Sequence, residues 1–248
     1  MKILLSGACG HMGREILALC AQNYHGITAK AGVDTNEDES CPVPCAGSFA
    51  EAETDVDCIV DFSHHAATKE LLSFAVKNRL PLVLATTGQT EDERAAILAA
   101  SEEIPLFFAA NYSLGIALLI KLAKQTASAF PDAEIEIIEK HHDRKLDAPS
   151  GTALAIFEGI KDVRPDAAAV LGRSGYAKRT QSEIGIHAIR MGNIVGEHEV
   201  IIGTPNQTIT LKHEAHSRAL FAEGALVAAE FLQGKGAGLY DMNSLLGN

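Results

Sequence analysis

The chain has 248 residues, of which 47% are hydrophobic and 21% charged, and this composition excludes a globally disordered protein. With 21 Lys and Arg against 32 Asp and Glu, the formal net charge is −11. This balance argues against a general nucleic-acid-binding protein, because such proteins carry a basic surface that neutralises phosphates. The length suits one large or two modest domains.

The cysteines and the N-terminal residues bear on location. Five cysteines is an odd number, and Cys41 and Cys45 form a C-x3-C pair whose spacing is typical of neither a redox motif nor a zinc site. We therefore expect reduced thiols, no metal site and a cytoplasmic protein. The N-terminal apolar stretch is too short for a signal peptide, and no window reaches the roughly 18 apolar residues of a membrane span.

The first 110 residues alternate between strand and helix signals. Short apolar runs predict buried strands at 2–6, 27–33, 58–62, 82–85 and 106–109. A helical pattern follows the first run, another begins near Ser63 and continues to Ala75, and a third begins at Thr90, where Glu93 completes a capping-box signature. Strands that alternate with helices in this way predict α/β structure with a parallel, doubly wound sheet.

The pattern changes after Asn111. A long helix is predicted over 114–129, and residues 133–137 then alternate strictly between apolar and polar, which is typical of a sheet with one solvent-exposed face. A helix is predicted from 149 to 160, followed by strands at 185–190, 194–202 and 208–213, with turns at Gly192-Asn193 and Pro205-Asn206. A final helix is predicted over 217–232, and its pattern fits either domain. We expect a second, α+β domain with a mixed or antiparallel open sheet.

Residues 7–13 read G-A-C-G-H-M-G, and this motif lies between the first strand and the first helix. Glycines there allow a tight turn and close approach to a pyrophosphate at the helix N-terminus, as in Rossmann-type sheets. Asp34 follows the second strand, 21 residues beyond Gly13, where an acid binds the ribose 2′-hydroxyl. Thr35 comes next rather than a basic residue, which favours NADH over NADPH. Alternatively, the glycines form an ordinary turn and Asp34 is a solvated acid.

Residues 139–152 read E-K-H-H-D-R-K-L-D-A-P-S-G-T and place two histidines and three cations within six residues at the end of a strand. Pro149 can occupy an early position of the predicted helix, whose first N–H groups can hold a carboxylate. A histidine nearby can donate a proton near neutral pH. The alternative is a solvated, charged loop beside a capped helix.

This segment closely resembles the E-x-H-H-x-x-K-x-D-A-P-S-G-T-A signature of the dihydrodipicolinate reductase family. The N-terminal glycine motif, T-T-G at 86–88, A-A-N-Y-S at 109–113, G-N-I-V-G-E-H at 192–198 and G-L-Y-D-M at 238–242 are also similar. The resemblance implies NAD(P)H-dependent reduction of 4-hydroxy-tetrahydrodipicolinate to tetrahydrodipicolinate, with loss of water, in the diaminopimelate route to lysine. It also implies a dinucleotide-binding domain at 1–112 plus 217–248, a substrate-binding and oligomerisation domain at 113–216, and a homotetramer.

The resemblance assigns roles to matching residues. His141 is expected to be the general acid and Lys145 a second catalytic donor, while His142, Gly151 and Thr152 are expected to bind a carboxylate of the small dicarboxylate substrate. Expected cofactor contacts are Gly7, Gly10, His11, Met12, Gly13, Asp34, Ala85, Thr86, Thr87, Ala109, Ala110, Asn111 and Tyr112. Ala85 stands where many relatives have glycine, and Thr35 where many have a basic residue. Both departures concern the cofactor.

Two other function classes compete with the reductase. One is a non-catalytic NAD(H)-binding sensor, which needs no proton donor such as His141 or Lys145; the other is an aspartate or homoserine dehydrogenase. The H-E-A-H run at 213–216 lacks metalloprotease spacing, and His64 and His65 suit a structural role. Residues 172–179, which include Arg173, Lys178 and Arg179, are expected to form a mobile solvated loop.

Overall fold

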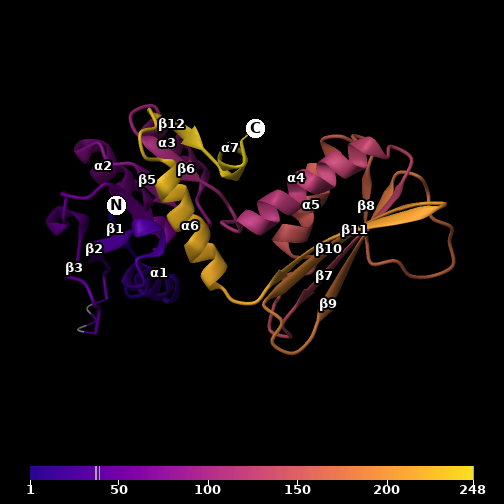
Figure 1. Cartoon of the computed structure of the whole chain (residues 1–248), viewed down its shortest axis with the longest axis horizontal. Helices are drawn as coiled ribbons and strands as arrows, with labels where there is room; N and C mark the ends of the chain where they lie inside the picture. Colours follow the sequence, from indigo (N-terminus) through magenta and orange to yellow (C-terminus); the bar gives the residue numbers. More distant parts are fainter. Residues whose placement is uncertain (37, 39, 248) are drawn as a thin grey trace. The chain divides into compact units, whose positions relative to one another are not determined.

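The computed structural model describes residues 1–36, 38 and 40–247, and the chain forms two compact units (Figure 1). The first unit comprises residues 1–113 and 219–248, and the second comprises residues 114–218. The final long helix therefore belongs to the first unit, although it follows the second unit in the sequence. In the described part of the chain, no helix is long and apolar enough to cross a membrane.

The first unit contains a seven-stranded parallel sheet with the order β12-β6-β5-β4-β1-β2-β3. This sheet confirms the predicted Rossmann-type α/β class. Its strands are β1 (Lys2–Ser6), β2 (Thr28–Val33), β3 (Cys45–Ala46), β4 (Cys58–Asp61), β5 (Leu82–Leu84), β6 (Pro105–Phe108) and β12 (Gly238–Tyr240). Its helices are α1 (His11–Ala21), α2 (Thr68–Asn78), α3 (Glu91–Ser101), α6 (Ala219–Phe231) and α7 (Met242–Leu245), with short 3-10 turns at Tyr24–Gly26, Phe49–Glu51 and His65–Ala67.

Burial on both faces explains why the central strands are almost wholly apolar. Ile3, Leu4 and Leu5 alternate between the two faces of β1, and all three are completely buried. Helices α2 and α3 pack on the face that carries Leu4, whereas α1 packs against α6. The carboxyl ends of β1, β2 and β4 are thereby held at one edge of the sheet, where polar residues begin.

Local signals fix two helix starts in this unit. The Thr90 Oγ1 accepts from the Glu93 amide at 3.3 Å, and Glu93 Oε2 accepts from the Thr90 amide at 2.7 Å, so the predicted capping box is confirmed. The helix expected from Ser63 begins later, at Thr68. A 3-10 turn at His65–Ala67 precedes it, and His64 Nδ1 accepts from the Ala66 amide at 3.2 Å.

The second unit contains a five-stranded mixed sheet with the order β11-β10-β7-β9-β8. The strands are β7 (Glu134–His141), β8 (Ala168–Leu171), β9 (Glu183–Arg190), β10 (Gly196–Thr204) and β11 (Gln207–Ala215). Strands β7, β8 and β9 run parallel, and β10 is antiparallel to both β7 and β11. Helices α4 (Leu114–Ala129) and α5 (Gly151–Lys161) cover one face (Figure 1), and Ile135 and Ile137 of β7 pack beneath them.

The two turns predicted between the last three strands differ in kind. Pro205-Asn206 is a two-residue hairpin turn, because Thr204 of β10 pairs directly with Gln207 of β11. Gly192-Asn193 does not close a hairpin, because β7 lies between β9 and β10. This segment instead crosses the end of β7: the Met191 amide donates to the His141 carbonyl, and the His142 amide donates to the Ile194 carbonyl.

The expectation of a wholly solvated loop at residues 172–179 is wrong for its two arginines. Arg173 pairs with Glu183 at 2.9 Å, and Arg179 contacts Glu136 at 3.4 Å and donates to the Ile135 carbonyl at 3.2 Å. Both guanidinium groups therefore attach the loop to β7 and β9. Tyr176, by contrast, is fully exposed.

Candidate active site

The glycine turn after β1 is shaped by close backbone packing. Gly7 has φ +78°, and a Cβ there would lie 2.4 Å from the Phe62 carbonyl oxygen. A Cβ on Gly13 would lie 2.2 Å from the Gly7 carbonyl oxygen. Only glycine fits these two positions, so the turn runs tightly into α1 and presents the amides of the helix N-terminus.

A pocket of about 310 Å³ opens beside this turn. Gly7 and Gly10 line it together with Asp34 and Thr35 from the end of β2 and His64 from the loop after β4. Among the described residues that line this pocket there is no Lys or Arg. The described lining therefore combines backbone donors with the carboxylates of Asp34 and Glu70 and includes no cation that could pair with a 2′-phosphate.

Asp34 is fixed by two backbone amides. Its Oδ2 accepts from the Cys9 amide at 2.9 Å, and its Oδ1 accepts from the Asn36 amide at 2.9 Å. The first bond joins the carboxylate to the glycine turn, so the acid and the helix N-terminus hold a set spacing. This spacing agrees with the expectation that Asp34 binds a ribose next to a pyrophosphate.

The other predicted cofactor residues lie on the loops after β5 and β6 of the same unit. The Thr86 hydroxyl donates to Asp61 Oδ2 at 2.6 Å, and burial raises the pKa of the Asp61 carboxyl. Tyr112 is buried, and its hydroxyl donates to the Leu84 carbonyl at 2.8 Å. Its phenol is thus a packing group, and a contact with a cofactor would fall to its backbone or to the more exposed Ala109, Ala110 and Asn111.

In the second unit, His141 is the last residue of β7 and is held by a buried carboxylate. Its Nδ1 lies 2.6 Å from Oε2 of Glu139, which is completely buried two residues earlier on the same face of the strand. Arg190 donates to both Glu139 oxygens at 2.7 and 2.8 Å, and the Ser150 amide donates to Oε1 at 3.0 Å. Strand register creates this cluster, since Arg190 is the β9 partner of His141.

The electrostatics define which atoms carry protons. Burial alone would raise the pKa of Glu139, but hydrogen bonds from Arg190, His141 and Ser150 outweigh it and lower that pKa. Glu139 is therefore ionised near neutral pH, and His141 Nδ1 must be the donor in their hydrogen bond. Burial also lowers the pKa of His141, and the Glu139 carboxylate opposes this effect. The remaining ring nitrogen, Nε2, is therefore the atom that can gain or lose a proton.

Gly196 of β10 leaves room beside that atom. A Cβ at this position would lie 3.1 Å from His141 Nε2, so any larger residue would crowd the nitrogen. His198, two residues along β10, packs edge-on to His141 with ring centroids 5.2 Å apart, and its Nε2 lies 3.2 Å from the Ser150 hydroxyl. Burial lowers the pKa of His198 to about 4, so its ring is neutral above that pH.

Lys145 and the start of α5 complete the group. The Lys145 ammonium pairs with Asp147 at 2.8 Å, and the Lys145 amide donates to the His142 carbonyl at 3.2 Å. Ser150 caps α5 by accepting from the Ala153 amide. A Cβ on Gly151 would meet nothing within 4 Å, so no other atoms pack against this residue. Hydrogen bonds from the Lys145 ammonium and the Gly151 amide lower the pKa of the Asp147 carboxyl, so a carboxylate of the chain itself lies at this helix N-terminus. A carboxylate can approach the first amides of α5 there.

The structure thus brings together His141, His142, Lys145, Gly151 and Thr152 in one unit, and the glycine turn with Asp34 in the other. We call His141, Glu139, Arg190 and His198 the histidine cluster. The sequence motifs did not identify Glu139, Arg190 or His198 as site residues. The E-x-H spacing could have revealed Glu139, because residues two apart on a strand share a face. The other two come from separate strands.

Comparisons with known proteins extend over the whole chain. Family models described as dihydrodipicolinate reductase N-terminus and C-terminus match residues 1–112 and 115–246. The 4-hydroxy-tetrahydrodipicolinate reductase of Clostridium novyi is 44% identical over 247 residues, covering 99% of this chain and 98% of that protein. The enzyme of the same name from Caldanaerobacter subterraneus is 44% identical over 252 residues, with 99% and 98% coverage.

A solved structure shares the fold. It is the dipicolinate-bound dihydrodipicolinate reductase of Paenisporosarcina sp. TG-14, which superimposes with a TM-score of 0.83 at 24% identity and covers 98% of both chains. The full-length family match, on a chain with a glycine turn and a buried histidine–carboxylate pair, leads to one conclusion: the chain belongs to the dihydrodipicolinate reductase family.

Proposed function

We propose that this chain reduces 4-hydroxy-tetrahydrodipicolinate to tetrahydrodipicolinate in the diaminopimelate route to lysine, with NADH as the preferred reductant. The observation that carries the proposal is the His141–Glu139–Arg190 cluster, which lies with Lys145 beside the N-terminus of α5. A sensor that only binds a nucleotide would not need such a proton-handling group. The names of the full-length relatives agree with the proposed reaction.

The first unit fits a nicotinamide dinucleotide. The amides at the start of α1 would hold the pyrophosphate, and the Asp34 carboxylate would accept from the ribose hydroxyls. When bound, the reduced nicotinamide supplies the hydride. The absence of Lys and Arg from the described lining of the pocket supports NADH, since a 2′-phosphate there would meet Asp34 without a compensating cation.

The second unit supplies positive charge and a proton. The amides of Gly151 and Thr152, together with His142, would hold one substrate carboxylate, and the Lys145 ammonium would attract the other. Reduction consumes one hydride and one proton and releases water. His141 delivers its proton from Nε2, while Glu139 keeps Nδ1–H in place and stabilises the imidazolium.

We propose that the assembled enzyme is a cytoplasmic homotetramer that uses the sheet of the second unit. Helices α4 and α5 cover one face of that sheet, and the opposite face carries partly buried Ile138 and Ile201 among charged residues. A second copy packed on this face would bury both isoleucines.

A coupled assay tests the function. Dihydrodipicolinate synthase generates the substrate in place, and oxidation of NADH and of NADPH is followed separately. We expect a higher kcat/KM with NADH and a product that forms in equal amount to the oxidised cofactor. Oxidation of neither cofactor would refute the reductase, and a strong preference for NADPH would refute only the role given to Asp34.

A further inference from the structure

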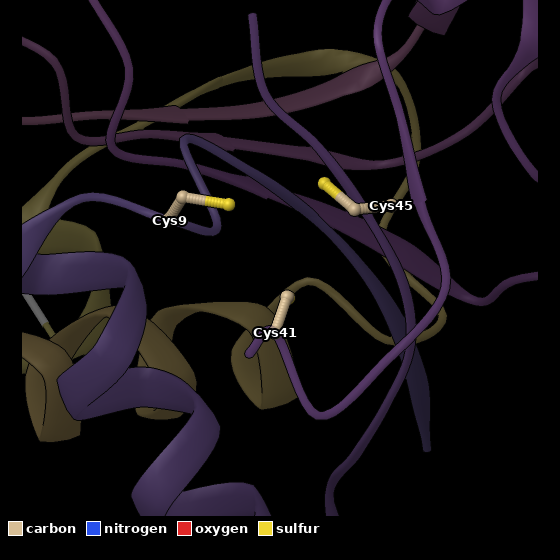
Figure 2. Close-up of side chains that lie close together, drawn as sticks. All are labelled: Cys9, Cys41 and Cys45. Carbon is tan, nitrogen blue, oxygen red and sulfur yellow. The ribbon is translucent and has the colours of Figure 1, made fainter. Parts of the chain in front are cut away.

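Three cysteines from separate segments converge beside the glycine turn (Figure 2). Cys9 lies in the turn between β1 and α1, Cys41 in the loop between β2 and β3, and Cys45 is the first residue of β3. All three are free thiols, and their sulfur atoms lie within 4.8 Å of one another. No disulfide or active-site role accounts for this cluster.

The backbone around the cluster holds it in place. The Cys9 amide is fixed by Asp34, and Cys45 pairs with Gly32 across the β2–β3 ladder. Gly32 also makes space for the sulfurs, because a Cβ there would lie 3.2 Å from Cys45 Sγ and 2.6 Å from the Ala8 Cβ. The convergence therefore depends on the folded sheet and not on the C-x3-C spacing.

The distances suit a shared cation. A tetrahedral zinc ion with Zn–S bonds of about 2.3 Å holds its sulfurs about 3.8 Å apart, so the three sulfurs need to close by only about 1 Å. A disulfide needs an S–S distance of about 2.05 Å and would use only two of the three. Three converging sulfurs are therefore explained better by a metal ion than by a redox pair.

We propose that Cys9, Cys41 and Cys45 form a three-thiolate site for a soft divalent cation of the zinc class. Binding converts three thiols to thiolates and releases three protons for each cation. In the described part of the chain no fourth His, Cys, Asp or Glu joins the group, so solvent or an added ligand takes the fourth position. A surface cavity of about 310 Å³ lined by Cys9 and Cys41, and the exposed Cys45, provide the entry path.

Occupancy would join the glycine turn to the segment that follows Asp34. The proposed function assigns the glycine turn and Asp34 itself to the dinucleotide, but metal binding does not depend on that assignment. The cation would stabilise the folded chain by binding it in preference to the unfolded chain, so we expect the Tm of the reduced protein to rise with added zinc.

The test uses the full-length reduced protein, with Zn²⁺ and Cd²⁺ as probes. Equilibrium dialysis should give one ion per chain, and Cd²⁺ should produce ultraviolet thiolate-to-metal absorption. Cys9→Ser, Cys41→Ser and Cys45→Ser should each weaken binding at least about tenfold. Cys20→Ala serves as the matched control, because Cys20 is a free cysteine of α1 outside the cluster, and it should bind as the wild type does.

If a variant fails to fold, counting the reactive thiols of the wild type still tests the proposal. Cys20 and Cys58 are buried, so the three cluster thiols are the ones expected to react in the folded protein, and bound Cd²⁺ should protect these three from alkylation. The proposal is overturned if the reduced wild type binds neither ion, if the variant lacking all three cysteines binds as well as the wild type, or if the cluster only forms a disulfide on oxidation.

Discussion

Replacing Glu139 with Gln probes the link between the fold and the proposed chemistry. The side chain is completely buried and accepts hydrogen bonds from Arg190, His141 and the Ser150 amide. Gln keeps the volume but removes the charge, and its amide donors would face the donors of Arg190 or His141. The variant therefore leaves the Arg190 guanidinium, whose side chain is only 18% exposed, without its counter-ion.

The size of the stability effect is worked out from these contacts and the usual energy of each kind of interaction. Hydrogen bonds to a charged group contribute about 1.5–3 kcal/mol each. Removing one partner of a buried ion pair costs about 3–5 kcal/mol, because the other charge stays buried. We expect Glu139→Gln to lower the free energy of unfolding by about 3–5 kcal/mol. Domains of this kind have about 5–15 kcal/mol in total, so this loss is a large part of the stability, and the folded fraction at 25 °C is measured together with the activity.

The effect on activity comes through His141. The Glu139 carboxylate raises the pKa of His141 against the effect of burial, so its loss lowers that pKa further. A nearby opposite charge shifts a pKa by about 1–3 units, and each unit removes tenfold of the protonated fraction at higher pH. We expect kcat/KM at pH 7 to fall about 10- to 1000-fold. Because the acid form is active, the rate declines as pH rises, and this decline should move to lower pH.

The assay is the pH profile of kcat/KM, measured with urea unfolding of the same samples. Glu197→Gln is the matched control, since Glu197 is a carboxylate of the same sheet that pairs with Lys140 at 2.9 Å outside the histidine cluster. It should cost less stability than Glu139→Gln, because the Lys140 and Lys212 ammonium groups that pair with Glu197 are 31% and 42% exposed, and it should leave the pH profile of kcat/KM unmoved. If Glu139→Gln retains wild-type kcat/KM with an unmoved profile, Glu139 does not position His141.

Three further predictions follow from the same geometry. Asp34→Asn should lower kcat/KM with NADH by about 10- to 100-fold and reduce the ratio of kcat/KM with NADH to kcat/KM with NADPH, because a charge-assisted hydrogen bond is worth about 1.5–3 kcal/mol. An unchanged ratio would contradict the role of Asp34 in ribose binding. His198 has a folded-state pKa of about 4, below its ordinary value, so protonation favours unfolding and stability falls as the pH drops from about 6.5 to 4. Between pH 7 and pH 4 the wild type should lose about 3 kcal/mol more than His198→Gln, measured by urea unfolding, and equal losses would exclude His198 as the cause. Ile201→Asp should dissociate the proposed tetramer in sedimentation velocity, and an intact tetramer would place the interface elsewhere.

Features that depend on residues close together in the sequence could be predicted without the structure. The capping box at Thr90 and Glu93 depends on residues three apart, and the alternating burial of β7 depends on residues two apart. In the glycine turn, the contact of Gly13 with the Gly7 carbonyl is local, whereas the contact of Gly7 with Phe62 comes from the end of the neighbouring strand. The local features were predicted because neighbours in the sequence carry their physical cause.

Very short strands and strand pairing between distant residues could not be predicted from the sequence. The short strands β3, β8 and β12 have two to four residues each, too few for a period to emerge. The placement of β7 between β9 and β10 depends on pairing across more than 40 residues, so the turn at Gly192-Asn193 gave no sign of it.

The sequence by itself determined the two classes of sheet, the glycine turn with its acid, and the histidine-rich strand end followed by a helix N-terminus. Tertiary structure decided which groups act on that histidine. Parallel register sets Arg190 opposite His141, and antiparallel register sets His198 opposite Glu139. It also gathered Cys9 with Cys41 and Cys45. Backbone pairing brings these residues together from distant positions, and no spacing along the chain encodes that pairing.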